Sequence, residues 1–152
     1  MAIPDGVGRA PVSALNPNPR NARTHSKAQI EQIAASIREF GFNNPVLVDE
    51  DFGIIAGHGR VEAAKLLGWT EVPVLELRHL NDAQKRAYIL ADNKLAEKAG
   101  WDSDLLALEL GELAGMDLGF DLTLTGFEMG EIDFLLEGAS GAEQEEPPPE
   151  PT

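Results

Sequence analysis

Apolar residues follow two patterns along the first two-thirds of the chain. In three stretches they recur every three or four positions, which predicts amphipathic helices at residues 27–40, 61–67 and 82–97. Elsewhere they form short continuous runs rich in Val, Ile and Leu, which predict strands at residues 10–15, 46–48, 53–56 and 72–77. Because strands and helices alternate in this way, we expect an α/β (α+β) fold with a small mixed sheet and packed helices.

Polar residues mark the ends of these helices. Ser26 occupies the N-cap position of the first helix, and Gln29 three positions later predicts a capping box. Asn81 and Gln84 repeat this arrangement at the third helix. Gly41 follows the first helix at the position where a glycine commonly ends one.

The last third of the chain is predicted to be mainly helical. Asp102 is the expected N-cap of a helix over residues 103–114, and a short helix is expected over 128–137, with a short strand within 119–126. The final residues are mostly Gly, Ala, Glu and Pro, which bury too little apolar surface to offset the entropy of ordering. We therefore expect a core of residues 1–98, an acidic helical extension of residues 99–137 packed on the core, and a disordered tail or linker of residues 138–152.

Charge divides the chain at the same place as the helical pattern. Residues 1–98 hold all 12 Lys and Arg together with 12 of the 26 Asp and Glu, and residues 99–152 hold the other 14 acids with no Lys or Arg. An acidic segment is repelled by nucleic acid, since non-specific affinity comes from neutralised phosphates. We therefore expect any anion site in the first two-thirds, with the acidic part serving as a solvated surface and flexible tail.

Composition also limits the chemistry and the location. The chain has no cysteine, so disulfides, thiolate metal ligands and a cysteine nucleophile are excluded. No apolar run approaches the roughly 20 residues that span a bilayer, and the first residues do not resemble a signal peptide. We expect a cytoplasmic protein without a membrane partner.

The most informative local feature is the turn Gly57-His58-Gly59-Arg60, between a predicted strand and a predicted helix. The first amides of a helix lack internal partners, and the helix dipole makes that end attractive to anions. The two glycines let an oxygen approach the backbone, while Arg60 offers a planar fork for phosphate. His58 adds a donor near neutral pH. These residues predict a phosphate site.

A second group of cations comes from the loop of residues 16–25, which contains Arg20 and Arg23. We expect this loop to close over the same ligand. Plainer interpretations stay open: the turn binds nothing, the loop arginines are solvated, and His58 has a structural role. The run Asp92-Asn93-Lys94 is polar enough to serve a site, but an exposed helix face is the favoured interpretation.

Several segments resemble the ParB N-terminal domain in order and spacing, from about residue 10 to 98. They are Asn-Pro-Arg-Asn-Ala-Arg-Thr-His-Ser, Ile-Arg-Glu-Phe-Gly-Phe-Asn-Asn-Pro-Val, Ile-Ile-Ala-Gly-His-Gly-Arg-Val-Glu-Ala-Ala and Val-Pro-Val. The later segments Ala-Asp-Asn-Lys-Leu-Ala-Glu-Lys-Ala-Gly-Trp and Leu-Thr-Gly-Phe resemble ParB-like domains of phages and prophages, which are often joined to DNA-modification methyltransferases. They extend the resemblance to about residue 137.

The resemblance implies the fold shared by ParB, sulfiredoxin and a free-serine kinase, with nucleotide phosphates on the turn. It places Gly57, His58, Gly59 and Arg60 in the family's Gly-Glu-Arg-Arg turn, and Arg20 and Arg23 in its N-terminal arginine loop. It makes CTP or ATP, with Mg, the candidate cofactors. The residues near the turn include no clear cluster of carboxylates and histidines for a catalytic metal, so no metal site is expected.

The chain departs from the family's pattern in three places. It lacks the reactive cysteine of sulfiredoxin, so that activity is excluded. His58 and Gly59 replace a glutamate and an arginine of the ParB turn. Finally, ParB continues into a basic helix-turn-helix, whereas this chain continues into acidic helices, which we do not expect to dock on DNA in that manner.

The sequence therefore favours a nucleotide- or phosphate-binding module in DNA modification or segregation, acting as a regulatory or targeting part. Its expected partners are a nucleotide, DNA through another protein, a methyltransferase domain or protein, and a second copy. One alternative is an enzyme of the same fold, either a CTPase- or ATPase-like hydrolase, a kinase or a nuclease, with His58 or Glu62 as acid-base groups. The other is a protein-interaction module that binds no nucleotide and presents the acidic helices to a basic partner.

Overall fold

The computed structural model describes the backbone of residues 6–21 and 23–144, and side chains up to residue 138. Contacts divide the chain into two compact units, Met1–Ala99 and Gly100–Thr152, here called unit 1 and unit 2. Each unit has its own elements and its own buried residues. We describe them separately.

Unit 1 contains the predicted small mixed sheet. Its four strands lie in the order β1 (Gly8–Pro11), β4 (Glu71–Glu76), β2 (Val46–Val48) and β3 (Ile54–Ala56). The central strand β4 pairs antiparallel with β1 and parallel with β2, and β2 pairs antiparallel with β3. The predicted α/β class is therefore confirmed, and β2 and β3 form a hairpin.

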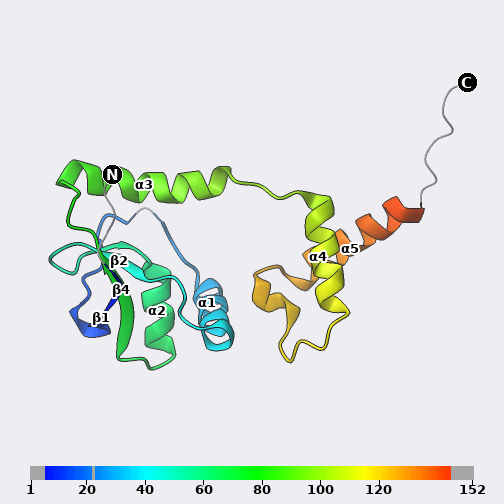
Figure 1. Ribbon diagram of the computed structural model, residues 1–152, viewed down its shortest axis with the longest axis horizontal. Coiled ribbons are helices and arrows are strands. Elements are labelled where there is room, and N and C mark those ends of the chain that lie inside the picture. Colours follow the sequence, from blue (N-terminus) through cyan, green and yellow to red (C-terminus); the bar gives the residue numbers. More distant parts are fainter. Residues whose placement is uncertain (1–5, 22, 145–152) are drawn as a thin grey trace, which may run out of the picture. The chain divides into compact units, whose positions relative to one another are not determined.

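Helices cover the sheet in layers. In unit 1, α2 (His58–Leu66) packs between β2 and α1 (Lys27–Phe40), while α3 (Asp82–Lys98) contacts β3 (Figure 1). The bounds of α1 match the prediction, because Ser26 Oγ accepts a hydrogen bond from the amide of Gln29 at 3.1 Å. Asn81 and Gln84 form the predicted capping box of α3, with both bonds present.

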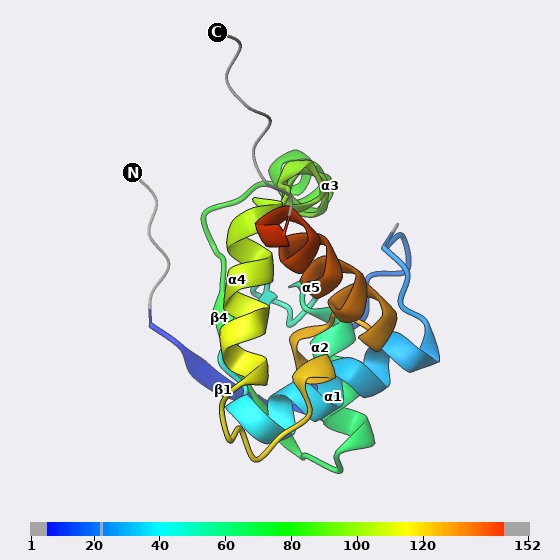
Figure 2. The same cartoon turned by 90° about the vertical axis from the view of Figure 1, so that its right-hand side faces the viewer.

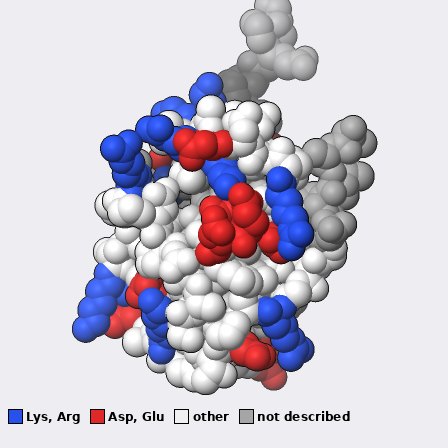
Figure 3. Space-filling view, turned by 90° about the vertical axis from the view of Figure 1, so that its left-hand side faces the viewer, with Lys and Arg blue, Asp and Glu red and all other residues white. Residues whose placement is uncertain are grey.

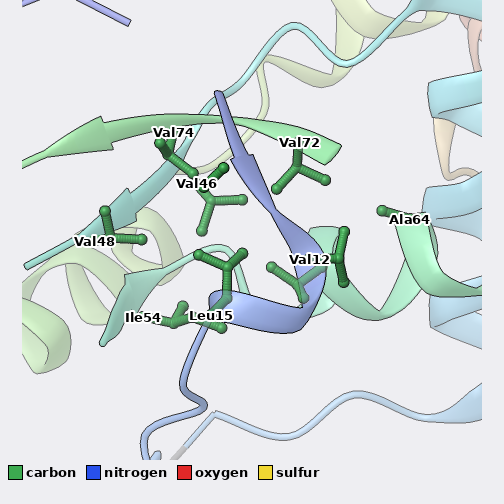
Figure 4. Packing of buried hydrophobic residues seen from close by; sticks show 10 residues of the cluster. Val12, Leu15, Val46, Val48, Ile54, Ala64, Val72 and Val74 are labelled. Atoms are coloured by element: carbon green, nitrogen blue, oxygen red, sulfur yellow. The ribbon is translucent and has the colours of Figure 1, made fainter. Parts of the chain in front are cut away.

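The core of unit 1 lies between the sheet and α2. Figure 4 shows valines of the strands facing residues that follow β1 and the helix residue Ala64. The labelled side chains are all buried: Val12, Leu15, Val46, Val48, Ile54, Ala64, Val72 and Val74. A smaller cluster of Ala34, Ile37 and Ala63 joins α1 to α2. These contacts fix the start of α2 relative to the end of β3.

Two local predictions for unit 1 need correction. The strand predicted over residues 10–15 ends at Pro11 and continues as the 3-10 helix η1 (Val12–Ala14). Val12 donates instead to the carbonyl of Thr70 at 2.9 Å. At Ser26 only the cap bond to Gln29 is present, because the Gln29 side-chain oxygen lies 3.0 Å from Nδ1 of His25.

Unit 2 consists of α4 (Ser103–Ala114), the 3-10 helix η2 (Leu122–Thr125) and α5 (Met129–Gln144). The helices α4 and α5 cross in contact with one another, as both views show (Figures 1 and 2). Ala107 and Leu110 of α4 and Ile132 of α5 are buried in this unit. A Cβ on Gly111 would lie only 3.4 Å from Leu136, so the glycine permits this close crossing.

Two predictions for unit 2 also need correction. The expected strand within 119–126 is instead η2, because Asp121 accepts hydrogen bonds from both the amide and the hydroxyl of Thr123 and so starts a helical turn. The last helix runs to Gln144 rather than ending at residue 137, since Ala, Glu and Gln favour helix. The rest of the predicted tail, residues 145–152, lies outside the described residues. Among the described helices, none combines the length and apolar character that crossing a bilayer requires.

Candidate functional site

The strand β3 ends at a turn that exposes the first amides of α2. Gly57 lies between β3 and α2, and its backbone adopts the left-handed conformation, with φ 109° and ψ 20°. Glycine adopts this conformation without the steric cost that a side chain brings. The helix then begins at His58, and its first N–H groups have no partner within the helix. Of the predicted turn, Gly57 precedes the helix, while His58, Gly59 and Arg60 form the first turn of α2, whose amides are available to an anion.

The guanidinium of Arg60 covers this turn. A Cβ on Gly57 would come within 3.0 Å of Arg60 Nη2 and 3.3 Å of Nε, so the glycine also makes room for the arginine. Nη2 donates to the carbonyl of Pro45 at 3.0 Å. Nε is buried and has no hydrogen-bond partner among the described residues. Burial lowers the pKa of Arg60, and the charge of Asp92 opposes that shift. An arginine stays charged in either case.

The turn forms one wall of a cleft of about 200 Å³. Arginine, histidine and carboxylate side chains line it together with backbone. The lining residues are Asn21, Arg23, His25, Ile33, Ile55, Ala56, Gly57, His58, Gly59, Arg60, Asp92 and Asn93. The structure thus brings together five of the six predicted phosphate-site residues: Gly57, His58, Gly59, Arg60 and Arg23.

The two loop arginines differ. Arg23 lines the cleft, and its Nη1 lies 2.7 Å from Oε1 of Glu97 on α3. Both side chains are partly exposed, so this ion pair is a weak constraint. Arg20 is exposed and is absent from the described cleft lining; its amide donates to Oδ1 of Asn18. Arg23 is therefore the loop cation that the structure places at the turn.

His58 connects the arginine loop to the turn. Its Nε2 accepts a hydrogen bond from the amide of Asn18 at 3.0 Å, so the ring is neutral in this arrangement. Burial lowers the pKa of His58 and the nearby His25 lowers it further, while Glu62 acts in the opposite direction. The lone pair of Nε2 is occupied by this bond, so the geometry gives His58 a positioning role.

Gly59 is buried where α1 and α2 meet. A Cβ there would lie 3.0 Å from Cδ1 of Ile33 and 3.1 Å from the ring of His25. The ParB turn has an arginine where this chain has Gly59. In this chain the ring of His25 occupies the space that a side chain at residue 59 would need. Because His25 is 34 residues from Gly59 in the sequence, only its position shortly after the arginines marks it as a site residue.

The helix α3 supplies two polar residues that the sequence alone places on an exposed face. Asp92 and Asn93 both line the cleft, so this helix face is more than a solvated surface. Asn93 Nδ2 donates to the carbonyl of Ile89 at 2.8 Å, which leaves its side-chain oxygen as an acceptor. Burial raises the pKa of Tyr88, and Asp92, to which it is hydrogen-bonded, adds to that shift. In the sequence, the only sign of these two site residues is that they form an adjacent polar pair within the helix.

Glu62 lies apart from the cleft. It pairs with Lys65 at 3.1 Å and lines a different hollow between α1 and α2. Among the described residues there is no group of three or more His, Cys, Asp or Glu that could hold a metal ion. Glu62 is thus absent from the lining of the cleft, although it lines the other hollow together with His58.

Surface charge on one face of the molecule is mixed. Figure 3 shows Lys and Arg scattered around and between Asp and Glu on this face, without a continuous basic stripe. Elsewhere in the ion-pair pattern of unit 1, Lys85 lies 3.5 Å from Asp49 and 3.4 Å from Glu50. A face of this kind does not attract a polyanion over a long distance.

The order of the strands, the layered helices and the glycine turn define a small mixed α/β domain with a candidate anion site. Residues 4–94 match the family model of the ParB N-terminal domain, and residues 104–152 match the ParB-methyltransferase HTH domain. The chain therefore belongs to the ParB N-terminal domain family. The acidic charge of unit 2 predicted that it would not resemble the basic helix-turn-helix of ParB. Its match to a helix-turn-helix family was therefore unexpected.

Curated relatives agree with this family. The ParB-like nuclease domain-containing protein YnaK of Escherichia coli K12 is 53% identical over 76 residues, covering 50% of this chain and 87% of YnaK. The nucleoid occlusion protein of Bacillus cereus AH187 is 37% identical over 97 residues, covering 60% of this chain and 33% of that protein. The matched part therefore spans about a third of the nucleoid occlusion proteins.

Solved structures show the same fold. The C-terminally truncated chromosome-partitioning protein ParB of Caulobacter crescentus, complexed with CTP-gamma-S, has a TM-score of 0.63 at 23% identity, with 91% of this chain and 89% of that chain covered. A Pnob8-like ParB-N domain has a TM-score of 0.51 at 22% identity, with 76% of this chain and 47% of that chain covered. At these identities the likeness concerns the fold.

Proposed function

We propose that the chain binds the phosphates of a nucleotide at the start of α2. The observation that carries this proposal is Arg60, whose buried Nε lacks a partner among the described residues and lies beside the glycine turn. A buried unpaired donor is costly, and an anion on the turn would satisfy it. The amides of residues 57–59 and the guanidinium of Arg23 add further donors around the same cleft.

The size of the cleft indicates which part of the ligand it holds. Its volume of about 200 Å³ is smaller than the roughly 300–1,000 Å³ of ordinary small-molecule sites. It therefore suits a phosphate chain, with the sugar and base extending beyond it. CTP is our first candidate because the Caulobacter ParB structure contains a CTP analogue, and ATP is the second.

Asp92 and Asn93 fit a magnesium ion that accompanies the phosphates. A carboxylate in a phosphate cleft would repel the ligand unless a cation lies between them. Mg²⁺ is commonly held by one or two carboxylates together with substrate phosphates. Bound there, the ion would neutralise phosphate charge, while the Asn93 side-chain oxygen would orient it or its water.

For the biological role, we propose a regulatory or targeting module in DNA modification or segregation, in a phage or prophage setting. The family of unit 2, named for ParB-methyltransferase proteins, supports an association with a methyltransferase domain or protein. Residues 99–152 carry 14 acids and no Lys or Arg, which favours contact with DNA through a partner.

A thermal-shift panel tests the binding proposal. CTP, ATP, GTP and ADP are added with and without magnesium to the wild type, to Arg60→Ala, and to Arg38→Ala, a control at an exposed position of α1. A nucleotide at about 100 times its dissociation constant should stabilise the fold by about 2.7 kcal/mol, which is several degrees in a domain of this size. We expect a shift in the wild type and in Arg38→Ala, but not in Arg60→Ala.

Calorimetric titration of the same proteins separates lost binding from a damaged fold. A cooperative melt of the wild type that no nucleotide shifts at millimolar concentration would refute the proposal. Nucleotide turnover can be followed in the same samples, and His58→Ala tests the enzymatic alternative. Turnover that survives in His58→Ala would exclude His58 as its acid-base group.

A further inference from the structure

Unit 2 has an apolar groove that is separate from its core. The groove has a volume of about 450 Å³, and its apolar walls come from α5, from the start of α4 and from the residues beside them. The main wall residues are Trp101, Leu106, Phe127, Phe134 and Leu135. Trp101 is 70% exposed and Phe134 is 76% exposed, so these aromatic residues are open to solvent in unit 2.

The groove is preformed. The rings of Trp101 and Phe127 lie 5.2 Å apart in an edge-to-face arrangement, which holds both side chains in place. The buried residues of the unit, Ala107, Leu110 and Ile132, are at most 4% exposed and do not line the groove. Trp101 and Phe134 are therefore not needed to fill the core, and exposed aromatic groups of this kind mark contact sites.

Charge restricts what can occupy the groove. Residues 99–152 contain 14 acids and no Lys or Arg, and Glu131 itself lines the groove. Asp102 and Asp104 flank the lining residue Ser103 in the chain. Anionic lipid, nucleic acid and a second copy of this acidic unit would all meet like charge. A segment that carries Lys or Arg beside apolar anchors would meet opposite charge and a matching apolar wall.

We propose that the groove docks a basic amphipathic helix from a partner protein. The apolar face of that helix would contact Trp101 and Phe134, and its Lys or Arg residues would lie against the acidic rim near Glu131. This is the helix-in-groove mode of recognition, in which spaced apolar anchors give affinity and flanking charges give specificity. The proposal does not depend on nucleotide binding by unit 1.

Fluorescence anisotropy with three labelled synthetic peptides tests the proposal on the full chain. The first peptide is an amphipathic helix with Lys on its polar face and Leu and Phe on its apolar face. The second replaces every Lys by Glu, and the third scrambles the first so that no apolar face remains. We expect saturable binding of the first peptide alone, and weakening as salt is added.

Substitutions then locate the binding surface. Phe134→Ala should weaken the first peptide by about tenfold or more, as expected for an aromatic anchor. Leu108→Ala is the matched control, because Leu108 is 58% exposed on α4 and lies outside the groove lining. Glu131→Gln should weaken binding by a few-fold. The substitution keeps a side-chain oxygen, which can still accept the hydrogen bond that the amide of Glu128 donates to Glu131.

Several results would overturn the proposal. These are equal binding of the basic and acidic peptides, equal binding of the scrambled peptide, no binding at high micromolar concentration, or Phe134→Ala binding as well as Leu108→Ala. The last experiment adds a labelled DNA duplex to the full chain. A duplex that binds and displaces the peptide would show that DNA, and not a basic helix, occupies this surface, in line with the helix-turn-helix family of this unit.

Discussion

The imidazole of His58 accepts a hydrogen bond from the backbone amide of Asn18, with 3.0 Å between Nε2 and N. This bond joins the first residue of α2 to a loop 40 residues earlier in the chain. Arg23 belongs to the same loop and lines the cleft beside the turn. The histidine thus helps to set the distance between the loop arginine and the amides of α2.

Stability should depend on pH through His58. Its folded pKa lies below the ordinary value near 6.5, because burial and His25 disfavour its charge. The unfolded chain therefore binds the proton more readily, so the stability that neutral His58 contributes is complete above about pH 6.5 and is lost as the pH falls through the folded pKa. His58→Ala should cost about 0.5–1.5 kcal/mol at pH 8 and progressively less toward pH 5.

Urea unfolding of the wild type and His58→Ala across this pH range measures the effect. His79→Ala, at an exposed position, is the matched control substitution. A stability difference between wild type and His58→Ala that is constant with pH would contradict the role of the neutral ring.

Gly57→Ala should be more destabilising than Gly68→Ala. Both residues have positive φ, 109° and 76°, so both substitutions carry the left-handed strain of about 1–2 kcal/mol. A Cβ at Gly57 also meets the Arg60 guanidinium at 3.0 Å, whereas nothing lies within 4 Å of one at Gly68. Chemical denaturation of both variants gives the comparison, and equal costs would show that Arg60 moves aside freely.

Glu97→Gln should raise nucleotide affinity by a few-fold. The carboxylate of Glu97 lies 2.7 Å from Arg23 and competes with a phosphate for the same guanidinium. Stability should change by less than about 1 kcal/mol, because the pair is partly exposed. Glu39→Gln on α1 is the control for lost negative charge. Unchanged affinity in Glu97→Gln would indicate that Arg23 does not contact the ligand.

Asp92→Asn should have opposite effects with and without magnesium. Without the ion, removal of a negative charge from the cleft should tighten nucleotide binding. With magnesium present, loss of a carboxylate ligand should weaken binding and remove most of the enhancement by the ion. Calorimetric titrations in magnesium and in chelator provide both values, and a change of the same sign in both conditions would argue against a metal at Asp92.

The parts of the fold that follow from short-range chemistry are those that the sequence predicts well. Caps at Ser26, Asn81 and Asp102 locate three helix starts, because each cap bonds an amide two or three residues away. The η2 turn was missed because an Asp–Thr bond can start a helical turn as readily as a strand boundary. The helix α5 extends beyond the predicted end because Ala, Glu and Gln favour helix even where a segment offers little apolar surface to bury.

In the candidate site, too, the features set by neighbouring residues are predictable from the sequence, and those set by distant segments are not. The turn from Gly57 to Arg60 is contiguous, so its chemistry is visible in the sequence. Asp92 reaches the cleft only through the path of α3 across β3, which depends on packing between distant segments. The loss of Arg20 from the cleft lining likewise reflects the course of its loop, which no local pattern specifies.

The helix α3 combines two properties with a practical consequence. All of its residues are described and none is buried, yet it carries Asp92 and Asn93 into the cleft. With so little buried surface, its amides should open locally at a low free-energy cost and exchange with deuterium early. A ligand that joins α2 to α3 would slow that exchange in α3 much more than in the buried strands. Deuterium uptake along this one helix would therefore reveal occupancy of the cleft for any ligand, without a label or an assay for chemistry.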